Sequence, residues 1–183
     1  MVLRALAFPL ALGLAPLLSA APACAAPVEL QPYEGPALPT LSLPLLTLSG
    51  PAGAHMRPVP DPAAQVLIVH FFGTWCEPCR AELPALARLA SRRPDVRVVL
   101  IDVAEPEARV RRFFAELAPP GPILMDQDRA ASRAFGVEVL PSTLVFAAGA
   151  PRLAARGEVA WDDPKVEAQL SALVPGDAGK KAS

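Results

Sequence analysis

The order of apolar and polar residues along the middle of the chain predicts strands and helices in alternation. The branched apolar run 66–72 is typical of a buried strand, and apolar residues recur at helical spacing from Glu77 to about Arg92. Further elements are expected in the order strand 96–101, helix 106–117, short segment 122–125, helix from 126 through 135, strands 142–146 and 152–156, and a last helix starting at Asp163 and Pro164. This order predicts an α/β sheet with parallel pairs.

The residues before this alternating region follow a different pattern. The stretch 26–60 holds eight prolines and few charges. Residues 41–43 and 46–49 alternate like short edge strands, whereas 52–60 looks like an irregular loop. We therefore expect a proline-rich extension at 26–60 packed on a sheet edge, a folded domain at 61–175, and a mobile tail at 176–183.

The first 25 residues have the pattern of a secretion signal. Arg4 gives a charged start, residues 5–18 are apolar and uncharged, and 19–25 are rich in small residues. Cleavage before Ala26 fits the small-x-small rule and predicts an exported protein. Two alternatives remain open: cleavage before Cys24, which leaves a cysteine for lipid attachment, and an uncleaved anchor.

Composition limits the classes of function. With 183 residues, 52% of them hydrophobic, the chain has enough apolar material for one domain with a proper core. The formal net charge is −1, and the arginine groups fall on the polar faces of predicted helices, so nothing suggests nucleic-acid binding. If Cys24 leaves with the signal, the two remaining cysteines cannot form a separate structural disulfide.

Those two cysteines, Cys76 and Cys79, lie where the strand 66–72 gives way to a helix. A helix N-terminus carries unpaired N–H groups and a partial positive charge, both of which favour a thiolate. Cys76, nearest solvent, is the expected attacking thiol, and Cys79, one turn in, is the expected resolving thiol. Pro78 suits the first helical turn, whereas the Glu77 carboxylate opposes thiolate formation, which predicts a reducing couple.

The sequence Trp75-Cys76-Glu77-Pro78-Cys79, after Phe71-Phe72-Gly73-Thr74 and before Arg80-Ala81-Glu82-Leu83-Pro84, resembles the TlpA/ResA-type thiol:disulfide oxidoreductases of the thioredoxin superfamily. The resemblance covers roughly residues 62–175. It implies a thioredoxin fold with a central mixed sheet flanked by helices, an extracytoplasmic location, and exchange with protein dithiols or disulfides. Candidate clients are the haem-binding cysteines of apocytochrome c and copper-site cysteines, and a membrane reductase would supply electrons.

The same resemblance suggests roles for residues outside the motif. Pro141 occupies the position of a cis-proline that faces the two cysteines, and Leu140 before it would present its backbone N–H and C=O to a client strand. Trp75, Glu77 and Pro78 are expected on the same client-binding surface. The alternative for Pro141 is an ordinary trans-proline entering an edge strand.

Two further candidates, Glu105 and His70, have a functional and a structural interpretation. The resemblance places Glu105 near the disulfide, where it would handle protons; otherwise it is a helix-start carboxylate ahead of Pro106. His70 stands where thioredoxins carry a buried aspartate. A neutral imidazole there would accept the proton of Cys79, and the alternative is a core histidine bonded to the backbone.

Metal-binding functions fit the sequence less well. Structural zinc needs four Cys or His ligands, and the chain offers three cysteines and two histidines, with Cys24 in the signal and His55 in a loop. A copper metallochaperone on this fold remains an alternative, but its extra spacer between the cysteines and its later histidine are missing. A thiol oxidant or isomerase is also open. We expect no metal and no cofactor beyond the Cys76–Cys79 disulfide; the sequence leaves the oligomeric state open.

Overall fold

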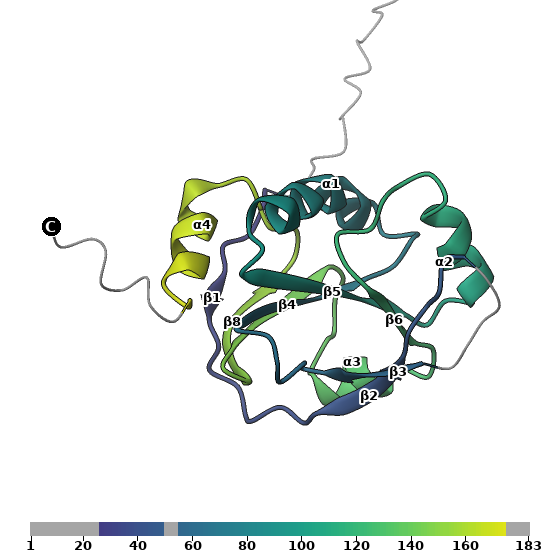
Figure 1. Ribbon diagram of the computed structural model, residues 1–183, viewed down its shortest axis with the longest axis horizontal. Coiled ribbons are helices and arrows are strands. Elements are labelled where there is room, and N and C mark those ends of the chain that lie inside the picture. Colours follow the sequence, from purple (N-terminus) through teal and green to yellow (C-terminus); the bar gives the residue numbers. More distant parts are fainter. Residues whose placement is uncertain (1–25, 50–54, 175–183) are drawn as a thin grey trace, which may run out of the picture.

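A mixed six-stranded sheet forms the centre of the computed structural model, which describes residues 26–49 and 55–174 (Figure 1). The strand order is β1-β8-β7-β4-β5-β6, with β4, β5 and β6 parallel and the other neighbours antiparallel. The strands are β1 (Gln31–Pro32), β4 (Val66–Phe72), β5 (Val96–Val103), β6 (Ile123–Asp126), β7 (Ser142–Ala147) and β8 (Ala150–Arg156). The expected signal at 1–25, with Cys24, and the expected tail at 176–183 lie outside the described residues.

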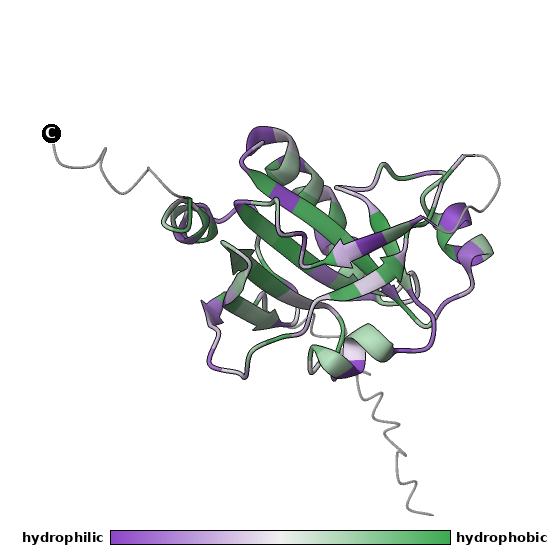
Figure 2. Ribbon diagram, turned by 60° about the horizontal axis from the view of Figure 1, so that its bottom comes forward, coloured by the Kyte–Doolittle hydropathy of each residue, from purple (hydrophilic) through white to green (hydrophobic). Residues whose placement is uncertain are grey.

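Helices cover both faces of this sheet. On one face, α1 (Glu77–Arg92), α2 (Glu107–Phe113) and α4 (Pro164–Ser171) contribute Leu86, Val110 and Leu170 to one core cluster. On the other face, α3 (Ala130–Ala134) packs with a small separate hairpin. Every residue of β4 is buried, which explains its unbroken apolar run apart from His70 (Figure 2).

The hairpin in the N-terminal extension differs from the predicted one. It pairs β2 (Leu41–Pro44) with β3 (Met56–Val59), so the predicted strand at 46–49 is wrong. The predicted irregular loop at 52–60 is wrong where β3 forms, and its residues 52–54 lie outside the described residues. The backbone of the first segment is used elsewhere, because the Leu46 N–H donates to the Ile123 carbonyl at 2.8 Å. This contact holds the end of the hairpin on β6, at one edge of the sheet, while β1 pairs with β8 at the other edge.

Two helices are shorter than their apolar patterns predict. The segments 106–117 and 126–135 form only α2 and α3, whereas α4 begins at Pro164 after the N-cap Asp163, as expected. In the second case the cause is visible, because Asp126 is the last residue of β6 and its carboxylate accepts hydrogen bonds from the N–H groups of Ala131 and Ser132. The carboxylate therefore satisfies the start of α3 from outside the helix.

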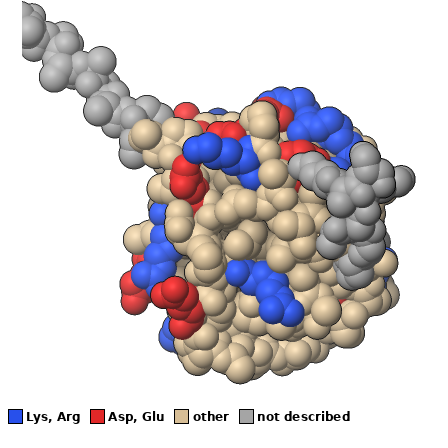
Figure 3. Space-filling model, turned by 90° about the vertical axis from the view of Figure 1, so that its left-hand side faces the viewer, with Lys and Arg blue, Asp and Glu red and all other residues tan. Residues whose placement is uncertain are grey.

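The surface on the side of α4 and β8 carries acidic and basic side chains in small separate groups among other residues (Figure 3). No broad patch of one sign covers that face. Within the described ranges, no helix combines the length and apolar character needed to cross a bilayer.

Candidate active site

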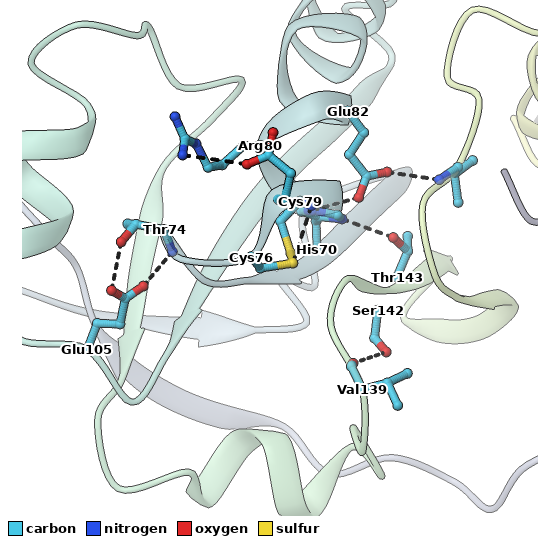
Figure 4. The surroundings of a disulfide bond; sticks show 12 residues. His70, Thr74, Cys76, Cys79, Arg80, Glu82, Glu105, Val139, Ser142 and Thr143 are labelled. Atoms are coloured by element: carbon cyan, nitrogen blue, oxygen red, sulfur yellow. Dashed lines mark hydrogen bonds and ion pairs between the residues drawn. A yellow bond between two sulfur atoms is a disulfide. The ribbon is translucent and has the colours of Figure 1, made fainter. Parts of the chain in front are cut away.

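The two motif cysteines form a disulfide at the N-terminus of α1 (Figure 4). Cys76 is the N-cap residue, and its Sγ accepts a hydrogen bond from the backbone N–H of Cys79 at 3.3 Å. Cys79 is completely buried, whereas Cys76 keeps a small exposed fraction of 5%. Cys76, the predicted attacking residue, is therefore the more exposed of the two cysteines. The Cys79 N–H is placed to stabilise a thiolate on Cys76.

Several apolar and polar groups expected to meet a client surround the disulfide. The Trp75 side chain is 57% exposed, and its ring packs so closely over Gly73 that a Cβ there would lie 2.9 Å from it. Glu77 is exposed and lies 3.7 Å from the Arg80 guanidinium. Pro78 occupies the first turn of α1.

The peptide bond between Leu140 and Pro141 is cis, as the resemblance implied. Antiparallel register pairs Ser142 with Phe71, so Pro141 lies at the end of β4 from which the cysteine motif departs. Exposed Val139 and half-buried Leu140 precede it, and the Ser142 hydroxyl donates to the Val139 carbonyl at 2.8 Å. An apolar edge thus borders the disulfide on this side.

His70 lies in the middle of β4, behind Cys79 (Figure 4), and is fully buried. Its Nδ1 is 3.0 Å from Thr143 Oγ1, so its ring bonds to a side chain rather than to the backbone. Its Nε2 faces Glu82 Oε1 at 3.4 Å. Burial lowers the pKa of His70 to about 3, so the imidazole is neutral at neutral pH and a weak proton acceptor.

Glu82 is a site residue that the sequence reasoning missed. Its Oε2 accepts hydrogen bonds from the Val159 N–H at 3.0 Å and the Trp161 Nε1–H at 2.8 Å. Burial raises the pKa of Glu82 to about 8, and these two donors offset only part of that effect. Because Oε2 already accepts two hydrogens, we place the carboxyl proton on Oε1, opposite His70.

One feature of the sequence points to Glu82. It follows Cys79 by three residues, which places both on neighbouring positions of one helix face, next to the buried Leu83. A carboxyl on the buried face of the helix that carries the resolving cysteine is unusual, because acidic residues are rarely buried without a partner.

Glu105 belongs to a second cluster, on the other side of the disulfide (Figure 4). Its carboxylate accepts hydrogen bonds from the Thr74 N–H at 2.5 Å and the Thr74 hydroxyl at 2.7 Å, and it forms an ion pair with Arg109 Nε at 2.9 Å. Asp102 Oδ1 accepts the Glu105 N–H at 3.3 Å. Burial, and then the charge of Glu105, raise the pKa of Asp102 to about 8.

Of the predicted site residues outside the motif, His70 and Glu105 lie on either side of the disulfide (Figure 4). Glu105 bonds to Thr74, two residues before Cys76, and no contact joins it to a sulfur among the described residues. Among residues 26–49 and 55–174, no group of three or more His, Cys, Asp or Glu side chains is arranged to hold a metal ion.

Known proteins resemble this chain in sequence and in fold. Over 82 residues it is 32% identical to the thiol-disulfide oxidoreductase ResA of Bacillus subtilis, which covers 44% of this chain and 46% of that protein. A DsbE-like thiol:disulfide interchange protein from Chlorobium tepidum superposes with a TM-score of 0.67 at 20% identity, covering 78% of this chain and 98% of that one. A secreted thiol-disulfide isomerase from Corynebacterium glutamicum gives 0.65 at 23% identity, covering 75% and 84%.

These similarities differ in what they show. The two solved structures establish the expected thioredoxin-like fold alone, and the chain matches about half the length of ResA. The model of the AhpC/TSA family matches residues 43–150, which include the disulfide, Glu82, Glu105 and Pro141. By that match over more than half of its length, the chain belongs to the AhpC/TSA family.

Proposed function

We propose that this protein is an exported thiol:disulfide oxidoreductase that reduces disulfides in protein clients. In the first step the Cys76 thiolate attacks one sulfur of the client disulfide. A mixed disulfide forms between Cys76 and the client, and the other client sulfur leaves as a thiolate that takes up a proton. The Cys79 thiol then loses its proton and attacks Cys76 Sγ, which releases the second client thiolate and regenerates the Cys76–Cys79 disulfide.

One observation carries this proposal: the disulfide lies at the start of α1, with Cys76 as the N-cap and its Sγ accepting the Cys79 N–H. A helix start stabilises negative charge, so a thiolate forms more readily there than in free cysteine. The exposed Trp75 directly precedes Cys76, and the cis bond before Pro141 lies at the end of β4 from which the cysteine motif departs. They support a surface on which a client chain meets Cys76.

The second step needs a group to accept the proton of the buried Cys79. We assign this role to Glu82, whose carboxyl lies one helical turn from Cys79 and whose pKa of about 8 is close to that of a thiol. In its carboxylate form Glu82 accepts the Cys79 proton and so becomes the protonated carboxyl of the oxidised protein. His70, neutral and bonded to Thr143, faces Oε1 at 3.4 Å, which supports a role as a positioning residue rather than as the base.

The reducing direction is supported by Glu77, whose exposed carboxylate, next to Cys76 in the sequence, makes negative charge on that sulfur less favourable. A less stabilised thiolate means a more stable disulfide and a couple with a lower reduction potential. Such a couple passes electrons to clients and must itself be reset by two electrons and two protons.

The cellular setting is part of the proposal. The pattern of residues 1–25 supports export, with lipid attachment at Cys24 or an uncleaved anchor as the other routes to an extracytoplasmic position. A membrane dithiol reductase would supply the electrons. Candidate clients are cysteine pairs that must be reduced before a haem or copper ion is attached.

The reduction potential of the Cys76–Cys79 pair tests this proposal. We expect a value near or below ~−270 mV on equilibration with thiol buffers, as for a thioredoxin-type reductase. A value near ~−120 mV would identify an oxidant and overturn the proposed direction. In parallel, Cys79→Ser should accumulate a mixed disulfide with a disulfide-bonded client whereas Cys76→Ser should not; the reverse result would overturn the assignment of the attacking thiol.

A further inference from the structure

A groove lies next to the disulfide between the first two turns of α1 and the helix α2. We call it the α1–α2 groove; its volume is about 670 Å³.

Thr74 and Glu77, which lie two residues before and one residue after Cys76, line this groove together with side chains of α2. A client chain joined to Cys76 through a mixed disulfide would therefore have this groove beside it.

The groove combines an apolar floor with guanidinium groups. Half-buried Phe113 and Leu117 supply apolar surface, and the Arg80 guanidinium lies over the Phe113 ring, 5.8 Å from its centre. Arg112 adds another guanidinium group on α2, whereas Arg109 is already paired with Glu105 at 2.9 Å. Such a combination suits a peptide that offers both an apolar side chain and carboxylates.

The groove also holds two acidic side chains, Glu77 and Glu116, but neither forms an ion pair with Arg112. Glu77 and Arg80 form an ion pair at 3.7 Å, but both side chains are more than half exposed, so their attraction is weak. Within the part of the chain that the structure describes, no carboxylate forms an ion pair with the exposed Arg112. Its guanidinium therefore remains available for a carboxylate from another molecule.

We propose that the α1–α2 groove binds the client segment next to the reactive cysteine and selects segments that carry Asp or Glu. This inference rests on the proposed reductase function and adds the class of client that the site prefers. The seven residues of α2 span about 10 Å, which is the length of about three extended residues. The groove thus recognises a short acidic stretch, with Arg112 as its main contact.

Three disulfide-bonded peptides that differ only beside the cysteine test this inference. One carries two Glu residues there, the second two Gln residues and the third two Lys residues. For the wild-type protein we expect kcat/KM to fall in that order, by ~10-fold from the first peptide to the third. Arg112→Glu should abolish or reverse the order, whereas Arg152→Glu, which changes an exposed arginine on β8, should preserve it.

The rate with dithiodipyridine, a small uncharged disulfide, separates the two proposals. If wild type and Arg112→Glu reduce it equally but wild type shows no preference among the peptides, the groove inference is overturned and the reductase function stands. If neither this compound nor any peptide is reduced, both proposals are overturned. Loss of the preference in Arg112→Glu alone, with an unchanged rate on dithiodipyridine, is the result that supports the acidic-client groove.

Discussion

Two buried carboxyl groups flank the disulfide, and they differ in whether a positive charge reaches them. Glu105 accepts two hydrogen bonds from Thr74 and forms an ion pair with Arg109. Glu82 accepts two hydrogen bonds from neutral donors and faces the neutral ring of His70. Both are almost completely buried, so burial alone does not separate them.

The difference teaches how one fold uses the same side chain in two ways. With a guanidinium beside it, a buried carboxylate can stay charged and hold the backbone through strong hydrogen bonds. Without such a partner, the charged form is disfavoured and the group keeps a proton near neutral pH. Glu105 is thus suited to hold the loop before Cys76, and Glu82 is suited to exchange a proton with Cys79.

The largest expected effect comes from removing the proton acceptor. In Glu82→Gln we expect resolution of the mixed disulfide to slow by ~100-fold, because an amide cannot accept the proton of Cys79. Stopped-flow measurement with a fluorescent disulfide peptide reports this step. Glu34→Gln, which makes the same change on an exposed residue of the N-terminal extension, is the control and should keep the wild-type resolution rate.

His70→Asn distinguishes the two members of the buried pair. If His70 only positions Glu82, this variant should slow resolution much less than Glu82→Gln and should shift the pH at which the rate is half-maximal. A loss as large as that of Glu82→Gln, with an unshifted pH profile, would return the role of base to His70.

The next effect concerns the stability of the Glu105 cluster. Glu105→Gln should lower the free energy of unfolding by about 2 kcal/mol, since an amide cannot accept from Thr74 and Arg109 together and leaves a buried donor unsatisfied. Urea unfolding of the oxidised protein measures this change. A stability equal to wild type would mean that Glu105 is only a helix-start carboxylate.

A smaller effect should appear as pH dependence on the Glu82 side. The native pKa of about 8 lies above the ordinary 4.5, so the folded protein holds a proton that the unfolded chain releases, and stability falls as pH rises between these values. His70 acts in the opposite direction below pH 6.5, where the unfolded chain takes up a proton that the buried ring does not. Above pH 6.5, His70 therefore no longer opposes the loss of stability with rising pH that Glu82 causes.

Between pH 6.5 and 8, the free energy of unfolding of Glu82→Gln should fall less steeply than that of wild type, by up to ~1.4 kcal/mol per pH unit. Urea unfolding at the two pH values measures it. Asp102, whose pKa is also raised to about 8, contributes a decline of the same sign, so Asp102→Asn serves as the comparison. If Glu82→Gln and wild type lose stability in parallel, Glu82 is not protonated in the folded protein.

The sequence was sufficient to predict the sheet and the disulfide, because both depend on local patterns. The run 66–72 and the helix beginning at Glu77 are strongly periodic, and both formed at the predicted residues. The hairpin was not predictable in the same way, since its second strand contains Pro58 and its formation depends on Leu46 being bound to β6. Such pairing is decided by tertiary contacts.

The residues of the candidate site likewise divide into those that local motifs reveal and those that depend on tertiary contacts. The cysteines, Pro141 and Glu105 were found from motif and resemblance, but Glu82 was not, because its surroundings come from distant parts of the chain. Val159 and Trp161 reach it across 77 and 79 residues. Only the folded structure shows that these donors are neutral and that no cation accompanies them among the contacts of Glu82.

The smallest expected effect concerns the backbone just before Glu105, and it tests whether that backbone is strained. Ala104, directly before Glu105, has a φ of 63°, a left-handed conformation that glycine adopts more easily. Ala104→Gly should therefore raise the free energy of unfolding by less than ~1 kcal/mol, with relief of strain partly offset by the greater freedom of glycine in the unfolded chain. Ala148→Gly, at a φ of 51° in the turn between β7 and β8, is the matched control. Similar gains in both would show that the strain at Ala104 is ordinary turn strain, whereas a loss of stability in Ala104→Gly alone would show that alanine is needed there to aim Glu105 at Thr74.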